Sequence, residues 1–221
     1  MASRAAVTSA ARRNVRFVAD DRFDVVLFAG VVEFHGTAKI AVVGQAGSGK
    51  KKIINQLAAS HGQASVRTSA LSGAEVARTE FIWPDPLPDG PFVRVRIFAL
   101  TGDPLHQAAE QCLLKDADAA VYVVNCDPKT IEASRACLLA MLANADLMGI
   151  DWARSTVVMQ YNQADRYPNF KPSDLDGWLG INGSAVSRHI TSTSGDDLGV
   201  GVMDAAAKVV NQLIKQLAHS E

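Results

Sequence analysis

A glycine-rich segment near the start of the chain follows an apolar run and precedes a helical pattern. The segment is Gly44-Gln45-Ala46-Gly47-Ser48-Gly49-Lys50-Lys51, the apolar run covers 40–43, and the helical pattern begins at Ile53. A strand, a glycine-rich turn and a helix in this order are typical of a P-loop, whose backbone N–H groups surround a phosphate at the positive end of the helix. Lys50 would add a positive charge for the β- and γ-phosphates. The segment therefore predicts an α/β fold that binds a nucleotide.

The residue after Lys50 departs from the P-loop pattern. P-loop nucleotidases use a Ser or Thr hydroxyl there to hold Mg²⁺, whereas this chain has Lys51. An ammonium group cannot ligate a cation and repels one. Two alternatives follow. Lys51 could place its charge near the phosphates instead of a metal, where a unit charge at ~4 Å contributes roughly 4 kcal/mol at an effective dielectric near 20, or it could point to solvent beside Lys52.

Length and composition indicate one globular domain with a sizeable core. The chain has 221 residues, 48% of them hydrophobic, and a net charge of −1. This balance gives no reason to expect nucleic acid as a partner, and no apolar run approaches the ~20 residues of a membrane helix. The cysteines, Cys112, Cys126 and Cys137, lack metal-ligand spacing. They predict buried thiols in a reducing compartment, which favours a cytoplasmic location.

The N-terminus differs from the rest. Residues 1–16 contain several arginines and no acidic residue, a composition shared by organellar transit peptides and by mobile basic tails. Asp20 and Asp21 follow at once, which favours the tail. We therefore expect a partly disordered N-terminal extension over 1–30 and a nucleotide-binding domain over 31–221.

Hydrophobic patterns predict alternating strands and helices. Runs that are apolar on both faces indicate buried parallel strands, and apolar residues at helical spacing indicate amphipathic helices. The expected strands are 40–43, 80–83, 92–98, 119–124 and 156–161, and the expected later helices are 130–147 and 198–218. The polar segment 59–78 is expected to be a long loop, and 84–91 a hairpin turn. The order predicts a three-layer P-loop α/β sandwich whose mostly parallel sheet has one antiparallel edge strand.

Two loops after predicted strands offer groups that could recognise a base. In such folds the ligand lies beyond the carboxyl ends of the strands. Asn162-Gln163-Ala164-Asp165 nearly matches the Asn-Lys-x-Asp signature of GTPases. Asp165 could accept hydrogen bonds from the guanine N1–H and 2-amino group, a donor pair that adenine lacks. Asn162 would brace neighbouring loops. The alternative is a polar surface loop that binds nothing.

The second of these loops covers 190–195 and follows the last strand. Ser192 and Thr193 could offer hydroxyl and backbone N–H groups to the guanine O6. Such residues also cap helices, so the alternative is a purely structural role.

Longer segments resemble MglA-type bacterial small GTPases, which are Ras-like switches that control cell polarity and gliding motility. The similar segments are 158–165 and 198–203, and residues 100–121 align without a gap to the family's second switch and the strand after it. The resemblance covers about 38–217. It implies a Ras-like fold, GTP or GDP as the ligand, and a roadblock-type protein partner similar to MglB.

The resemblance also implies roles for residues near the phosphates. Arg78 and Thr79 match the family's first switch, in which the Arg is an internal arginine finger and the Thr closes on Mg²⁺. Gly102 matches the switch glycine, and Asp103 replaces the catalytic Gln. An ionised Asp accepts hydrogen bonds but cannot donate them, and it adds negative charge beside the γ-phosphate.

Besides Lys51 and Asp103, two further residues depart from the GTPase motifs. Ala99 stands where Ras-type proteins have the Asp of Asp-x-x-Gly, and Gln163 replaces the Lys of the guanine signature. We therefore expect GTP hydrolysis to be slow or absent and Mg²⁺ to be dispensable. The leading hypothesis is a guanine-nucleotide switch that orders loops 59–90 and 100–106 around the γ-phosphate. The alternatives are a nucleotide-free pseudo-GTPase that acts as a scaffold, and an adenine-nucleotide enzyme in which Asp165→Ala would leave affinity unchanged.

Overall fold

The protein folds into an α/β structure with two compact units. The computed structural model describes residues 23–28, 31–61, 67–71, 74–83, 92–101, 107–148, 150, 156–167, 169, 171–181, 186–192 and 195–218. The larger unit comprises 38–81 and 95–221, and the smaller one comprises 1–37 and 82–94. The basic segment 1–16, for which a mobile tail was predicted, lies outside the described residues.

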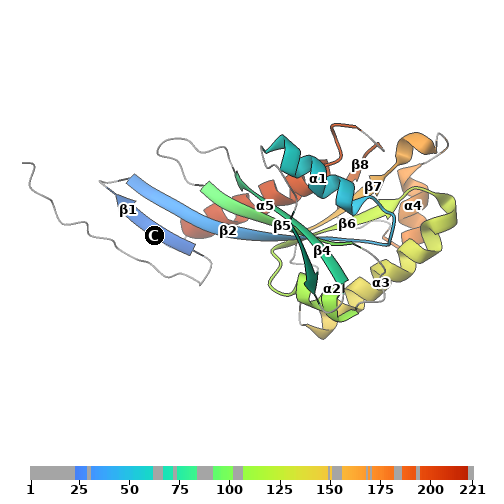
Figure 1. The fold of residues 1–221 in the computed structure, drawn as a ribbon, viewed down its shortest axis with the longest axis horizontal. Coiled ribbons are helices and arrows are strands. Elements are labelled where there is room, and N and C mark those ends of the chain that lie inside the picture. The colour runs from blue at the N-terminus through green and yellow to red at the C-terminus, as the bar shows by residue number, and fades with distance from the viewer. Residues whose placement is uncertain are drawn as a thin grey trace, which may run out of the picture. The chain divides into compact units, whose positions relative to one another are not determined.

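The strands pair in the order β3-β4-β5-β2-β6-β7-β8, and β1 pairs with β2 (Figure 1). Their bounds are β1 Phe23–Phe28, β2 Val31–Val43, β3 Arg67–Leu71, β4 Ala74–Trp83, β5 Phe92–Thr101, β6 Ala119–Asn125, β7 Thr156–Asn162 and β8 Ser187–Ile190. The pairings β2–β6, β6–β7 and β7–β8 are parallel, and β1–β2 and β3–β4 are antiparallel. A mostly parallel sheet with an antiparallel edge was predicted, and the edge of this sheet at β3–β4 is antiparallel. Neither β3 itself nor the antiparallel β1–β2 pair was foreseen.

Helices cover both faces of the larger unit's strands. They are α1 Lys50–Ser60, α2 Gln107–Leu114, α3 Ile131–Leu147, α4 Pro172–Leu179 and α5 Val200–Ala218, with short 3-10 turns η1 at Pro128–Thr130 and η2 at Ala164–Arg166. α1 and α5 lie on one face, and α2, α3 and α4 lie on the other (Figure 1). The helices expected at 130–147 and 198–218 are thereby confirmed as α3 and α5.

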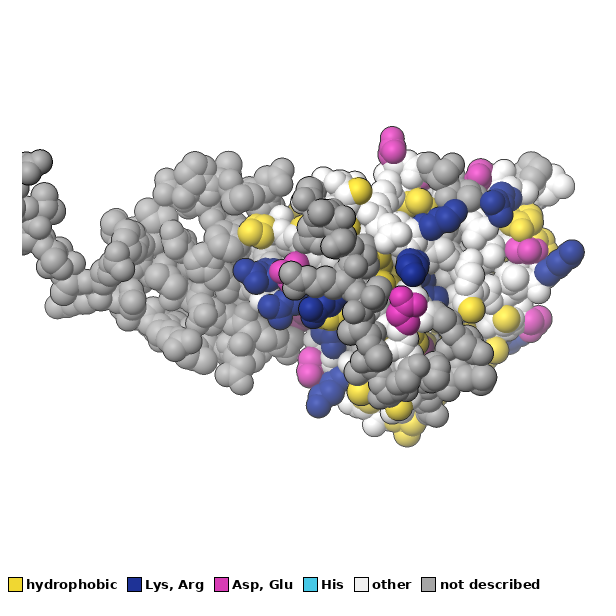
Figure 2. Space-filling view, in the orientation of Figure 1, with side chains coloured by type: hydrophobic (Ala, Val, Ile, Leu, Met, Phe, Trp, Pro, Cys, Tyr) yellow, Lys and Arg dark blue, Asp and Glu magenta, His cyan; other side chains and the backbone are white. Residues whose placement is uncertain are grey.

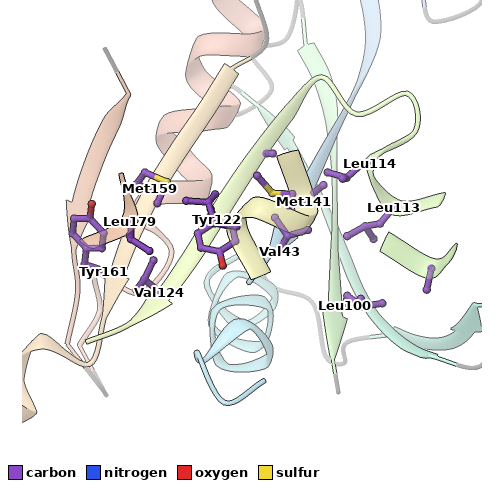
Figure 3. Close-up of a cluster of buried hydrophobic side chains, with 14 of the residues drawn as sticks. Val43, Leu100, Leu113, Leu114, Tyr122, Val124, Met141, Met159, Tyr161 and Leu179 are labelled. Atoms are coloured by element: carbon purple, nitrogen blue, oxygen red, sulfur yellow. The ribbon is translucent and has the colours of Figure 1, made fainter. Parts of the chain in front are cut away.

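The core forms because the central strands are apolar on both faces. Residues 119–124 of β6 are all buried, as predicted for a strand between two helical layers. On the α2–α3–α4 face, Tyr122, Met141 and Met159 belong to one buried cluster with side chains from the neighbouring strands (Figure 3). The Tyr122 hydroxyl donates to the Ser134 carbonyl at 2.5 Å, so this buried polar group is satisfied.

The prediction of a long loop at 59–78 is wrong. Helix α1 continues to Ser60, and this segment contains all of β3 and the first half of β4. Val76 and Ala77 are buried, and the register pairs Ser69 with Val76 and Arg67 with Arg78. Strand pairing satisfies the backbone hydrogen bonds here, so a segment with polar side chains still forms strands.

Other expectations gave mixed results. β4 and β5 are neighbours, as expected of a hairpin, but its turn at 84–91 lies outside the described residues.

Cys126 is buried, Cys137 is half-buried and Cys112 is exposed, so the prediction of buried thiols is wrong for Cys112. Cys112 lies on the solvent side of the short helix α2. No helix in the described ranges is long and apolar enough to cross a membrane.

Candidate functional site

The loop between β2 and α1 has the backbone geometry that its glycines were expected to provide. The φ angles are 137° at Gly44, 75° at Gly47 and 100° at Gly49, a region that favours glycine. A Cβ atom at Gly44 would collide with the backbone of Val123, and one at Gly49 would collide with the side-chain amide of Asn162. Glycine is therefore required both by the turn and by the close approach of neighbouring strands.

This loop leads into the positive end of α1. The first turn of α1 contains no acidic side chain. The first backbone N–H groups of a helix have no partners within the helix, so this end favours an anion. The Ser48 hydroxyl, fully buried in the same loop, has no hydrogen-bond partner among the described residues. Because buried polar groups are normally paired, a bound ligand or a water would complete this loop.

The Lys50 side chain folds back under the loop. It is only 5% exposed, and its ammonium group donates to the carbonyls of Gly44 and Gln45 at 2.7 Å each. An ammonium group has three donors, so one remains for a ligand. Burial lowers the pKa of Lys50 to about 8, and attraction to Cys137 and Glu110 opposes that shift. The positive charge is therefore aimed into the loop at neutral pH.

The Lys51 side chain points to the surface and away from the Lys50 ammonium group. Its side chain is 57% exposed, and its ammonium group lies 3.6 Å from Glu75 Oε1 at the start of β4. The Glu75 carbonyl also accepts a hydrogen bond from the Thr101 hydroxyl at 3.0 Å. The residue at the position that holds Mg²⁺ in P-loop nucleotidases is thus engaged in a surface ion pair here. In the described part of the chain no group of three or more His, Cys, Asp or Glu side chains could hold a metal ion.

Asn162 joins three loops at the carboxyl ends of the strands. Its buried amide donates to the Ser48 carbonyl at 2.8 Å, and its Oδ1 accepts from the Thr191 hydroxyl and the Gln163 N–H at 3.0 Å each. Its carbonyl accepts from the Cys126 N–H at 3.0 Å. Asn162 thus braces its neighbours as the sequence suggested.

The rest of the expected base motif lies beside the glycine-rich loop of residues 44–49. Gln163 has a φ of 66°, and its side-chain amide donates to the Gly47 carbonyl at 3.2 Å. The Ala164 N–H donates to the Thr191 carbonyl at 3.1 Å. Asp165 follows in η2 and is exposed. The structure therefore brings Gly47, Gln163 and Thr191 together and leaves the Asp165 carboxylate open to solvent.

The loop after β8 contributes a residue that the sequence did not single out. Thr191, which is 1% exposed, makes the contact to Asn162. Ser192 is half-buried, and its hydroxyl donates to Asp197 Oδ1 at 3.3 Å. Thr193 lies outside the described residues. The one feature of the sequence that could have pointed to Thr191 is its place directly after a predicted strand.

The residues expected near the γ-phosphate are only partly described. Arg78 and Thr79 lie within β4 rather than in a loop, with Arg78 exposed and Thr79 buried. Adjacent residues of a strand point to opposite faces, so the two side chains do not converge. Gly102 and Asp103 lie outside the described residues, and Ala99 is buried in β5.

A buried polar cluster near Lys50 was also missed. Asn144 on α3 donates to Glu110 Oε2 at 2.9 Å, and the Gln111 amide donates to Asn144 Oδ1 at 3.2 Å. Burial raises the pKa of Glu110, while the Asn144 hydrogen bond and the charge of Lys50 oppose the shift. The charge of Glu110 thus couples α2 and α3 electrostatically to Lys50 at the start of α1. The members of the cluster are too far apart in sequence to suggest a contact.

Comparison with protein-family models finds no match to this chain, and comparison with curated proteins finds no significant match either.

Proposed function

We propose that this protein is a Ras-like, guanine-nucleotide-binding regulatory protein with little or no Mg²⁺-dependent GTP hydrolysis. The phosphates would lie in the loop of residues 44–49, against the N-terminus of α1. Lys50 would donate to them with the ammonium hydrogen that the loop carbonyls leave unused. The loop lies at the carboxyl end of β2, where ligands of open α/β sheets bind.

The observation that supports this proposal most strongly is the hydrogen-bonding pattern of Asn162. Its side chain connects the glycine-rich loop, through Ser48, to the loops after β7 and β8, through Gln163 and Thr191. A polar side chain that is 1% exposed and ties three loops together holds them at fixed separations. Loops that bind phosphate and base at the two ends of one nucleotide need such fixed separations.

Base selection would depend on Asp165. Its carboxylate is exposed beside Gln163 and Ala164, which are held to Gly47 and Thr191. A guanine that enters from solvent could donate N1–H and its 2-amino group to this carboxylate, and an adenine could not. We infer that GDP and GTP bind more tightly than ADP and ATP.

Metal use and hydrolysis would be weak. Lys51 has no group that can ligate Mg²⁺, and its pairing with Glu75 favours the solvent-side alternative over charge compensation at the phosphates. Arg78 and Thr79 lie in a strand with opposite exposures, which does not favour their joint action on a γ-phosphate. The protein would therefore act through its binding state rather than through turnover.

A nucleotide-free pseudo-GTPase that acts as a scaffold is the second candidate. Two contacts favour this candidate, because they give both ammonium groups partners within the protein. Lys50 donates to carbonyls of its own loop, and Lys51 pairs with Glu75. The resemblance to MglA-type proteins suggests, for either candidate, a cytoplasmic regulator of polarity or motility and a roadblock-type partner.

Competition against a fluorescent GDP analogue tests the proposal. Unlabelled GDP, GTP, ADP and ATP would be titrated with Mg²⁺ and with EDTA, using protein from which bound nucleotide has been removed. We expect guanine nucleotides to compete at least tenfold better, because guanine offers the Asp165 carboxylate a donor pair that adenine lacks, and we expect EDTA to change little. Asp165→Ala should remove the preference, and Asp174→Ala, an exposed aspartate on α4, is the matched control.

Each other outcome has a definite meaning. Failure of every nucleotide to bind folded protein would overturn the proposal and favour the scaffold. Tighter binding of ADP than of GDP would instead favour an adenine-nucleotide protein, and equal binding of the two would contradict the selection of guanine by Asp165. Loss of guanine binding in EDTA would contradict the metal-independent mode.

A further inference from the structure

A cavity apart from the proposed nucleotide site is lined by residues in or next to η1, α3, η2 and α4. It has a volume of about 240 Å³ and shares no residue with the proposed nucleotide-binding set. Its inner wall includes Ile131 and Leu175, which are 6% and 1% exposed, and the exposed Pro128 also lines it. Ile131 and Leu175 belong to the buried core of the larger unit, so the inner wall of the cavity is packed.

An aromatic side chain stands at the mouth of this cavity. Trp178 on α4 lines it and is 51% exposed. An indole that keeps half of its surface in water leaves a large apolar plane available for a flat ligand. In Figure 2, hydrophobic side chains lie next to both basic and acidic side chains on the surface where α3 and α4 meet.

The charged residues of the cavity are mainly cationic. Arg166 and Lys171 line it together with Asp174, so the charged side chains sum to one net positive charge. All three are exposed, and Arg166 and Lys171 form no ion pair with another described residue. The cavity also lies at the N-terminal end of α4, where the helix dipole adds positive potential.

Cys126 forms a neutral part of the wall. It is 2% exposed, and burial raises the pKa of its thiol to about 12, with the Asp165 charge adding to the shift. The thiol is therefore uncharged at neutral pH and behaves as a small apolar group that does not repel an anion.

We propose that this cavity binds a small aromatic acid, with the ring between Trp178 and the apolar wall and the acidic group beside Arg166 and Lys171. The size supports this class of ligand. Pockets for drug-sized molecules have volumes of about 300–1,000 Å³, so a cavity of about 240 Å³ suits a smaller ligand with one or two fused rings. This inference does not depend on the proposed nucleotide site.

Calorimetric titration with 1-naphthoate tests the site on the full-length protein. The neutral 1-naphthamide has nearly the same ring and shape but no charge. We expect naphthoate to bind about fivefold to tenfold more tightly than naphthamide, because a charge-assisted hydrogen bond is about twice as strong as a neutral one. The double variant Arg166→Gln, Lys171→Gln should remove that preference and leave naphthamide binding unchanged.

A second variant tests the aromatic contact. Trp178→Ala should weaken both ligands by about fivefold, because it removes the stacking surface. Arg135→Gln, which removes an exposed cation of α3 that does not line the cavity, should change neither. Circular dichroism and thermal unfolding would verify that each variant folds. Absence of binding at millimolar naphthoate, equal binding of the two ligands, or unchanged binding in both pocket variants would overturn the proposal.

Discussion

At the scale of single residues, Asn162 has the largest structural role in the proposed site. Substitution by Ala would remove the side-chain partner of the Ser48 carbonyl and of the Gln163 N–H. It would also remove one partner of the Thr191 hydroxyl, which keeps a longer hydrogen bond to the Tyr161 carbonyl. Each buried group left unsatisfied costs about 1–3 kcal/mol. We therefore expect Asn162→Ala to lower the free energy of unfolding by about 2 kcal/mol or more, measured by urea denaturation.

The matched control is Asn55→Ala, because Asn55 is an exposed asparagine on α1. Exposed substitutions of this kind usually change stability by less than about 0.5 kcal/mol. Equal effects of the two substitutions would contradict the structural role given to Asn162.

The lowered pKa of Lys50 predicts that the stability of the fold depends on pH. Its pKa is about 8 in the folded protein and 10.5 in an unperturbed lysine. Between these values the unfolded chain binds a proton that the folded protein does not, so the free energy of unfolding rises with pH. A shift of this size is equivalent to about 3 kcal/mol across that window. The measurement is chemical denaturation at pH 7.5 and pH 10.

Other groups also titrate over this range, so the comparison must be made between variants. Lys50→Met should show a smaller increase in the free energy of unfolding between pH 7.5 and pH 10 than the wild type. Lys52→Met should keep the full increase, because Lys52 is an exposed lysine of the same helix. An identical pH profile in wild type and Lys50→Met would show that Lys50 is not buried as described.

At the scale of secondary-structure elements, the short strand β8 is attached to α5 by a polar cluster. His189 Nε2 lies 2.9 Å from Asp204 Oδ2, and the Lys208 ammonium donates to the same oxygen at 2.9 Å and also to the Ser187 hydroxyl. Burial acts to raise the pKa of Asp204, but the hydrogen bonds from His189 and Lys208 outweigh it and hold that pKa below 3.8. The lowered pKa means that folding favours the ionised carboxylate.

The consequence is a loss of stability in acid. The contribution of Asp204 is fully present above the ordinary pKa of an aspartate and is lost as the pH falls through the lowered folded value. Asp204→Asn should therefore reduce the free energy of unfolding by about 1 kcal/mol at pH 7 and by much less near pH 2. Glu132→Gln, an exposed site on α3, is the control. A deficit that stays the same at both pH values would argue against the ion-pair role.

Some elements could be predicted from the sequence because their signal is local. The runs of β6 and β7 are apolar on both faces, and the glycines at 44, 47 and 49 mark a turn that other residues disfavour. β3 could not be predicted, because its sequence, Arg67-Thr68-Ser69-Ala70-Leu71, is mainly polar and the strand is defined by its pairing with β4. Thr191 and Glu110 were missed for a related reason: their partners, Asn162 and Asn144, lie about thirty residues away in the sequence.

At the scale of the whole molecule, the described residues of the proposed nucleotide site all lie in the larger unit, residues 38–81 and 95–221. They come from segments that follow β2, β7 and β8, which are far apart in the sequence. Their proximity is a consequence of parallel strands whose carboxyl ends lie at one edge. A nucleotide bound there would contact the segments that begin at Gly44 and Asn162 at the same time.

Hydrogen–deuterium exchange with GDP tests this central claim most directly. Nucleotide-free protein would be measured alone, with GDP and with ADP, all in EDTA. We predict slower exchange in peptides that cover 44–57 and 160–166 when GDP is added, and little change with ADP. Unchanged exchange in both segments with saturating GDP, in protein whose fold is verified by circular dichroism, would contradict the account.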